Sequence, residues 1–168
     1  MCVPADASPP IEPIKGAAIE HRRLTLRSAD GTAFGAFEAT SGRGGPAVIV
    51  LPDVRGMFGF YEELALRFAE VGHDALTIDY FGRSAELPPR EPEFDFRPHV
   101  GATTFEGIRM DVAAAVEHLR ADDAERRLFT VGFCFGGSNS WYQAAAGHGL
   151  SGAIGFYGNP DRRDVPLG

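Results

Sequence analysis

The spacing of hydrophobic residues changes from segment to segment along the chain, and these changes predict alternating strands and helices. Residues 47 to 51 are continuously apolar, which is typical of a strand buried on both faces. Apolar residues then recur at helical spacing from Tyr61 to Ala69, and Gly72 provides a stop signal. Residues 74 to 79 form the next strand-like run. The pattern predicts a strand–helix–strand unit.

The same alternation continues on both sides of this unit. Residues 21 to 26 and 32 to 38 alternate as in a hairpin around a turn at 29 to 31, which predicts two antiparallel edge strands. Further along, an amphipathic helix at 105 to 119 precedes a strand at 127 to 131. The remaining signals predict a helix from near Ser138 to Ala146 and a last strand at 152 to 157. We therefore expect an α/β fold with a mostly parallel sheet covered by helices.

Two segments fall outside this alternation. Residues 1 to 18 contain four prolines and no apolar run, which predicts a flexible leader and neither a signal peptide nor a membrane span. Residues 79 to 104 are rich in proline and longer than a simple connection, so they form either a lid or an insertion without a role. The 168-residue length and the 44% hydrophobic content suit one globular domain over 19 to 168.

Charge and cysteine content narrow the classes of partner. The net charge is −7 and no cluster of lysine and arginine is visible, which argues against nucleic acid and membrane surfaces as partners. We expect a small-molecule ligand instead. The two cysteines, Cys2 and Cys134, cannot form a disulfide framework, which favours a reducing compartment and a cytoplasmic location.

Candidate chemistry is concentrated at Cys134, which lies in the run Gly132-Phe133-Cys134-Phe135-Gly136. In a G-x-nucleophile-x-G turn the chain passes sharply from a strand into a helix, and side chains at the two glycine positions would collide. The positive end of the following helix favours a thiolate, and the Phe135 N–H lies where an oxyanion would form. These features predict a nucleophile for acyl transfer. The alternative is a small buried cysteine with a packing role.

Ligands of open α/β sheets bind at the carboxyl ends of the strands. Three such ends carry polar or catalytic residues in this chain. They are residues 51 to 56, residues 79 to 83 and the cysteine turn itself. Because parallel strands end at the same edge of a sheet, we expect these segments to converge.

These motifs together resemble the dienelactone hydrolase family of cysteine-dependent α/β-hydrolases. The likeness runs from about residue 20 to 158. It rests on the G-x-C-x-G-G turn at 132 to 137, Asp53 with Gly56, the Asp-Tyr-Phe-Gly-Arg run at 79 to 83, and residues 155 to 158. The resemblance implies an α/β-hydrolase fold and hydrolysis of an ester or lactone such as carboxymethylenebutenolide, without a cofactor or metal.

The resemblance also implies roles for individual residues. Cys134 would be the nucleophile, and the N–H groups of Val54 and Phe135 would form the oxyanion hole. Arg83 would hold a substrate carboxylate, a task that suits the guanidinium fork, although an exposed loop arginine would look the same. Asp53 stands where the family has a glutamate that activates the thiol, and it is one methylene shorter. The alternative for Asp53 is a cap on the following helix.

The aspartate and histidine of the family's catalytic triad have no match in this chain. His148 is the only histidine after Cys134, and the intervening helix would carry it about 15 Å from the site at 1.5 Å per residue. His99 is on the proper edge of the sheet, where a solvated loop histidine is the ordinary alternative. Asp161 and Asp164 follow the last strand and are not assigned. We expect the N-terminal two-thirds of a hydrolase, truncated after the strand at 152 to 157.

Two other functions stay open. The first is a catalytically silent α/β domain that binds a small carboxylate, or a partner chain through an exposed apolar sheet edge, which would also permit self-association. The second is a glutamine amidotransferase or a related cysteine-turn protein. One branch of those proteins places histidine directly after the cysteine, where this chain has Phe135. They also lack the pattern at 79 to 83.

Overall fold

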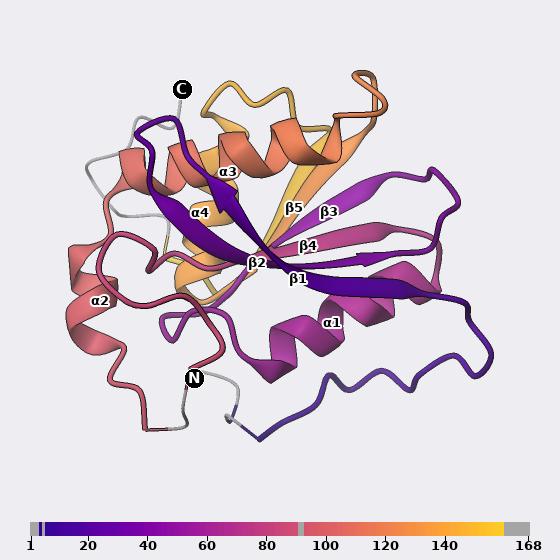
Figure 1. Ribbon diagram of the computed structural model, residues 1–168, viewed down its shortest axis with the longest axis horizontal. Helices are drawn as coiled ribbons and strands as arrows, with labels where there is room; N and C mark the ends of the chain where they lie inside the picture. Colours follow the sequence, from indigo (N-terminus) through magenta and orange to yellow (C-terminus); the bar gives the residue numbers. More distant parts are fainter. Residues whose placement is uncertain (1–3, 5, 91–92, 160–168) are drawn as a thin grey trace.

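A single six-stranded sheet organises the computed structural model, which describes residues 4, 6–90 and 93–159 (Figure 1). The strands are β1 (Glu20–Arg27), β2 (Ala33–Thr40), β3 (Ala47–Leu51), β4 (Asp74–Ile78), β5 (Leu128–Phe133) and β6 (Gly152–Phe156). The helices are α1 (Gly59–Glu70), α2 (Arg97–Ala102), α3 (Phe105–Leu119) and α4 (Phe135–Ala144).

The order of the strands across the sheet is β1-β2-β4-β3-β5-β6. β1 and β2 form the antiparallel hairpin that the sequence predicts, and β2 also pairs antiparallel with β4. Of the two hairpin strands that were expected at the edge of the sheet, β1 is an edge strand and β2 is an interior strand. The pairings of β4 with β3, β3 with β5, and β5 with β6 are all parallel. The carboxyl ends of β3, β4 and β5 consequently lie at one edge of the sheet.

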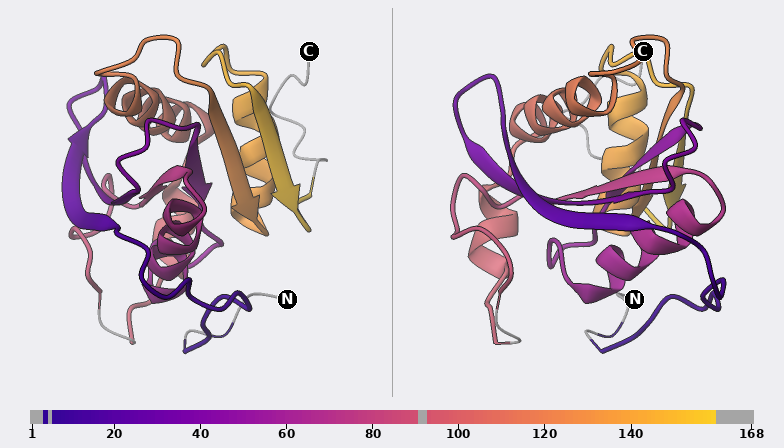
Figure 2. Two further views of the ribbon diagram at one scale, coloured as in Figure 1. Left: turned by 90° about the vertical axis from the view of Figure 1, so that its right-hand side faces the viewer. Right: turned by 45° about the vertical axis from the view of Figure 1, so that its right-hand side comes forward.

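Helices cover both faces of the sheet, with α1 on one face and α3 and α4 on the other (Figure 2). Alternate residues of β3 face the two layers, as the buried run predicts. Val48 and Val50 pack in a cluster with Tyr61 and Leu64 of α1. Ile49 and Leu51 belong to a larger cluster with side chains of α3. This packing makes β3 the centre of the core and fixes the position of the loop that follows it.

The structure corrects the boundary of one helix and adds another. α4 begins at Phe135, directly after Cys134, and not near Ser138. Gly136 and Gly137 lower the helix propensity of that first turn, but their lack of side chains permits close contacts that hold the turn in place. The segment from 79 to 104 contains α2, a short helix that the low periodicity did not predict.

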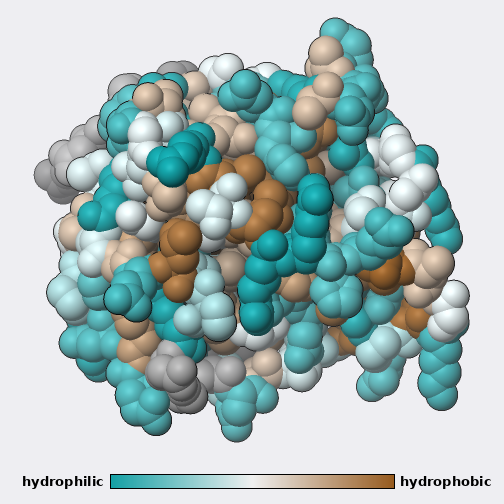
Figure 3. Space-filling model, viewed as in Figure 1, coloured by the Kyte–Doolittle hydropathy of each residue, from teal (hydrophilic) through white to brown (hydrophobic). Residues whose placement is uncertain are grey.

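Apolar side chains of β6 are exposed at the end of the sheet. Ile154 is 52% exposed and Phe156 is 47% exposed, in agreement with the predicted apolar edge. A groove of about 340 Å³ runs along the same face, where Phe129, Val131 and Ile154 meet Phe68 of α1. The face that carries β1 and β2 is largely hydrophilic, and apolar side chains gather near its middle (Figure 3). None of the helices described is both long enough and apolar enough to cross a membrane.

Candidate active site

Cys134 occupies a strained turn between β5 and α4. Its φ of 56° and ψ of −114° lie in a region that residues with side chains rarely adopt. The Cys134 N–H donates to the Phe156 carbonyl at 2.9 Å, and its own carbonyl accepts from Ser138 N at 3.2 Å. Strain of this kind costs about 1–3 kcal/mol and persists where the surroundings hold it. The thiol is half-buried at the end of the sheet.

The elbow, which we define as residues 132–136, requires both of its glycines. A Cβ atom on Gly132 would lie 2.8 Å from the Gly137 nitrogen and closer still to the Gly136 carbonyl. A Cβ on Gly136 would lie 2.6 Å from the carbonyl carbon of Leu51. Real side chains avoid such distances. The structure therefore has no room for a side chain at either glycine, as the sequence predicts. The close packing of Gly136 against Leu51 joins the elbow to the end of β3.

The β3–α1 loop, residues 52–58, lies against the elbow. Gly56 N donates to the Asp53 carbonyl at 3.1 Å, which closes a tight turn, and Gly56 has a φ of 78°. Val54 is the second residue of this turn, and no acceptor in the described part of the chain bonds to its N–H. Phe135 is the first residue of α4, so its N–H lies at the positive end of that helix. The two N–H groups expected to bind an oxyanion thus belong to touching segments.

Asp53 is paired with Arg55. The carboxylate is fully buried and receives the Arg55 guanidinium at 2.7 Å, together with the Arg55 backbone N–H at 2.9 Å. The alternative role of Asp53, as a cap on the next helix, is wrong, since α1 has Phe58 at its N-cap without a side-chain hydrogen bond. None of the hydrogen bonds of the Asp53 side chain in the described residues reaches Cys134. Arg55 was not predicted as part of the site, although its position two residues after Asp53, in the loop that follows a strand, was a usable signal.

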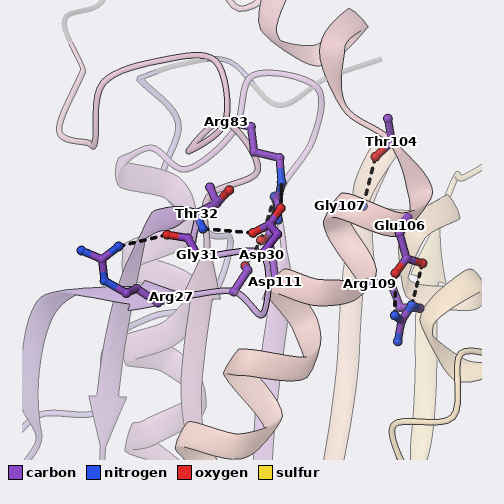
Figure 4. A network of polar contacts seen from close by, with 11 residues as sticks. Arg27, Asp30, Gly31, Thr32, Arg83, Thr104, Glu106, Gly107, Arg109 and Asp111 are labelled. Carbon is purple, nitrogen blue, oxygen red and sulfur yellow. Dashed lines mark hydrogen bonds and ion pairs between the residues drawn. The ribbon is translucent and has the colours of Figure 1, made fainter.

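Arg83 lies beside two carboxylates (Figure 4). Its guanidinium reaches both oxygens of Asp111 at 2.8 Å and Asp30 at 3.0 Å. Burial raises the pKa of Asp111, although hydrogen bonds from Ser28 and Arg83 oppose that rise. Arg83 therefore connects Asp30, in the turn between β1 and β2, to Asp111 of α3. A substrate carboxylate would have to compete with both aspartates.

Another buried ion pair, between Arg90 and Asp79, shapes the long segment after β4. The Arg90 guanidinium binds both oxygens of Asp79, at 2.7 and 2.8 Å, and lies over the ring of Phe94. A cavity of about 390 Å³ lies beside this pair, between the long segment and the start of α1. Its lining combines aromatic side chains, such as Phe58 and Phe96, with arginines. No pattern in the sequence indicates this role of Arg90.

His99 and His148, the two histidines considered as bases for Cys134, are each bound to other side chains. His99 stacks on Phe94, with ring centroids 5.0 Å apart, and its Nδ1 lies 3.0 Å from the Ser84 hydroxyl. His148 lies beyond α4 with its Nε2 2.8 Å from the Gln143 side chain, and burial lowers its pKa. Asp161 and Asp164 lie outside the described residues. The described part of the chain contains no group of three or more potential ligands that could hold a metal ion.

Comparisons with known proteins agree with this architecture. The profile of the dienelactone hydrolase family matches residues 34–166. A probable 2-oxo-3-(5-oxofuran-2-ylidene)propanoate lactonase from Bradyrhizobium is 33% identical over 119 residues, which are 67% of this chain and 46% of that protein. A carboxymethylenebutenolidase from Pseudomonas putida is 23% identical over 142 residues, 80% of this chain and 60% of that protein.

A solved structure gives the same result for the fold. A Klebsiella pneumoniae protein classed as a dienelactone hydrolase is 26% identical and superposes with a TM-score of 0.73 over 84% of this chain and 61% of that protein. The chain spans about half of the length of the curated relatives that it matches.

Proposed function

The chain belongs to the dienelactone hydrolase family, and we propose on that basis that it carries the cysteine nucleophile of an enzyme that hydrolyses esters or lactones. The observation that supports the proposal most strongly is the strained backbone of Cys134 at the start of α4. A cysteine with only a packing role has no need of a costly conformation. A sharp turn that places a half-buried thiol at the end of the sheet suits a nucleophile.

The proposed reaction is acyl transfer through a thioester. The Cys134 thiolate attacks the carbonyl carbon, a C–S bond forms, and the carbonyl oxygen becomes an oxyanion. We propose that the N–H groups of Val54 and Phe135 stabilise this oxyanion. The C–O bond of the ester or lactone ring then breaks, and its oxygen leaves with the electron pair. Water attacks the thioester carbonyl and releases the acid, while the thiol is regenerated with a proton from that water.

Carboxymethylenebutenolide and related lactones are the proposed substrates, in line with the names of the relatives. Their oxygen leaves as an enolate, which is a weaker base than an alkoxide and needs less help from an acid. Arg83 is the proposed partner of the substrate carboxylate. Since Asp30 and Asp111 already neutralise that arginine, binding would require an exchange of ion-pair partners. We propose that the Asp53 carboxylate acts on the Cys134 thiol after it separates from Arg55.

The ring opening of carboxymethylenebutenolide, followed by ultraviolet absorbance, tests this proposal. Cys134→Ala should abolish the reaction, and Cys2→Ser should leave it unchanged. Arg83→Gln adds a test of the carboxylate site, because it should slow an anionic lactone more than a neutral ester. Equal slowing of both substrates would contradict the binding role of Arg83. An unchanged rate in Cys134→Ala would contradict the function.

The exposed face of β6 supports a second candidate function, that of a catalytically silent domain that binds a small carboxylate or a partner chain. Ile154 and Phe156 would be covered by such a partner, because apolar edge residues of this size favour association. Analytical ultracentrifugation of the chain and of Ile154→Lys distinguishes the two candidates when it is combined with the lactone assay. An associating chain without lactonase activity would favour the silent domain, and an active monomer would contradict it.

A further inference from the structure

Two buried tyrosines bind the same peptide group of the β3–α1 loop from opposite ends. The Tyr80 hydroxyl donates to the carbonyl oxygen of Pro52 at 2.9 Å. The N–H of Asp53 donates to the hydroxyl oxygen of Tyr61 at 3.0 Å. That carbonyl and that N–H belong to one peptide unit, so the orientation of its plane is fixed by both hydroxyls.

Each tyrosine is itself held by a rigid element. Tyr61 is in the first turn of α1 and is fully buried, with the rings of Phe58 and Phe60 edge-on at 5.0 and 5.2 Å. Tyr80 follows β4 and is also buried, and its ring lies at 80° to that of Phe135 with the centroids 5.4 Å apart. The clamp, defined as the two tyrosine hydroxyls on the peptide between residues 52 and 53, thus connects the loop to α1, to β4 and to the start of α4.

The protonation states suit these hydrogen bonds. Burial raises the pKa of Tyr61, and the nearby Asp53 carboxylate raises it further. Burial also raises the pKa of Tyr80 well above its usual value, with smaller contributions from Tyr61 and the neighbouring aspartates. Both phenols are neutral at neutral pH. Tyr80 therefore keeps the proton that it donates.

The peptide unit that follows the clamped one carries the N–H of Val54. The turn bond from Gly56 N to the Asp53 carbonyl restrains this second unit from its other end. The clamped carbonyl of Pro52 also faces Gly136 of the elbow, where no Cβ would fit. The loop is therefore fixed at the point where it touches the nucleophile turn.

We propose that Tyr61 and Tyr80 are positioning residues that fix the Val54 N–H beside the elbow. The proposal rests on the function proposed above, in which that N–H binds the oxyanion. Oxyanion stabilisation depends on donors that are already aligned before the reaction, and small displacements reduce it strongly. Neither phenol has to touch the substrate, because each acts through the loop backbone.

Two reactions of the same thiol provide the test. Acylation of Cys134 by p-nitrophenyl acetate forms a C–S bond, passes through a tetrahedral oxyanion and expels p-nitrophenolate. Alkylation by iodoacetamide also forms a C–S bond, but it expels iodide and develops no oxyanion. The single-turnover rates of both reactions would be measured in a Cys2→Ser background, in which Cys134 is the only thiol.

Tyr61→Phe and Tyr80→Phe keep the ring and remove only the hydroxyl that holds the peptide. We expect each variant to lower the acylation rate about tenfold or more, with an unchanged alkylation rate. Tyr142→Phe is the matched control, since it removes a buried phenol hydroxyl that donates to the Asn159 carbonyl at 3.2 Å. It should change neither rate. The urea midpoint of every variant would also be measured, to show that each variant is folded when its rates are compared with those of the parent.

The outcomes separate the inference from the function on which it rests. Unchanged acylation in both Phe variants would overturn the clamp, and so would equal losses in acylation and alkylation, which would indicate a displaced thiol. If the parent chain is alkylated but never acylated, the proposed function fails, and the role of the clamp fails with it. Selective loss of acylation in either variant supports the inference.

Discussion

Replacing Gly136 with alanine tests whether contact between the elbow and the β3–α1 loop holds the candidate site together. The new Cβ would lie 2.6 Å from the carbonyl carbon of Leu51 and closer still to the carbonyl oxygens of Leu51 and Pro52. Favourable carbon–carbon contacts need about 3.5–4.0 Å, so backbone on one side must move by about 1 Å. All three atoms are main-chain atoms, and no side-chain rotation can relieve the overlap.

The expected cost is about 3 kcal/mol of unfolding free energy, at the upper end of what overpacking usually causes. For a chain of this size, that corresponds to a decrease of roughly 6–12 °C in Tm. Urea denaturation followed by circular dichroism measures the loss. The acylation rate of Cys134 should fall as well, because the elbow and the loop would separate.

Gly101→Ala is the matched control for this substitution. Gly101 is in α2, and a Cβ there meets nothing within 4 Å. Alanine in a helix is favoured over glycine by about 0.5–1 kcal/mol, so this variant should be as stable as the parent or slightly more stable. If Gly136→Ala and Gly101→Ala unfolded at the same urea concentration, the argument for the contact would be refuted.

Two further predictions concern the buried charges. Arg90→Leu should destabilise the chain by about 3 kcal/mol, because it leaves the buried Asp79 carboxylate without its ion-pair partner. Arg97→Leu removes an exposed ion pair and should cost less than about 0.5 kcal/mol in the same denaturation assay. Burial opposes the ionisation of Asp74, but hydrogen bonds that include one from Arg126 lower the pKa of Asp74 overall. The ionised Asp74 therefore stabilises the folded chain above about pH 4, and this stabilisation is lost as the pH falls further. Asp74→Asn should flatten the pH dependence of the urea midpoint in that range, and an unchanged slope would contradict this assignment.

The sequence was most informative where one local pattern determines the structure. The apolar run at β3 and the helical spacing in α1 and α3 predicted those elements correctly, because burial on a face repeats with the period of the element. The start of α4 was predicted three residues too late. Its glycines disfavour a helix locally, and the contacts with Leu51 that compensate are visible only in three dimensions.

In the candidate site, too, the features that depend on a local pattern were predicted and those that depend on contacts between distant residues were not. The glycine spacing around Cys134 predicted the sharp turn, since the reason is steric and local. The pairing of Arg83 with Asp111 joins residues 28 positions apart, and no pattern in the sequence specifies which carboxylate an arginine will bind. The same holds for Tyr61 and Tyr80, which as isolated residues look like ordinary core aromatics. Their hydroxyls acquire a role only when α1 and β4 pack beside the loop.

The central claim, that Cys134 is an acyl-accepting nucleophile, is tested most directly by the intact mass of the chain after brief treatment with p-nitrophenyl acetate. Cys2→Ser should gain one acetyl group, peptide mapping should place it on Cys134, and the Cys2→Ser, Cys134→Ala double variant should gain none. An acetyl group found equally in the double variant, or no acetylation of a chain whose Cys134 still reacts with iodoacetamide, would contradict the claim.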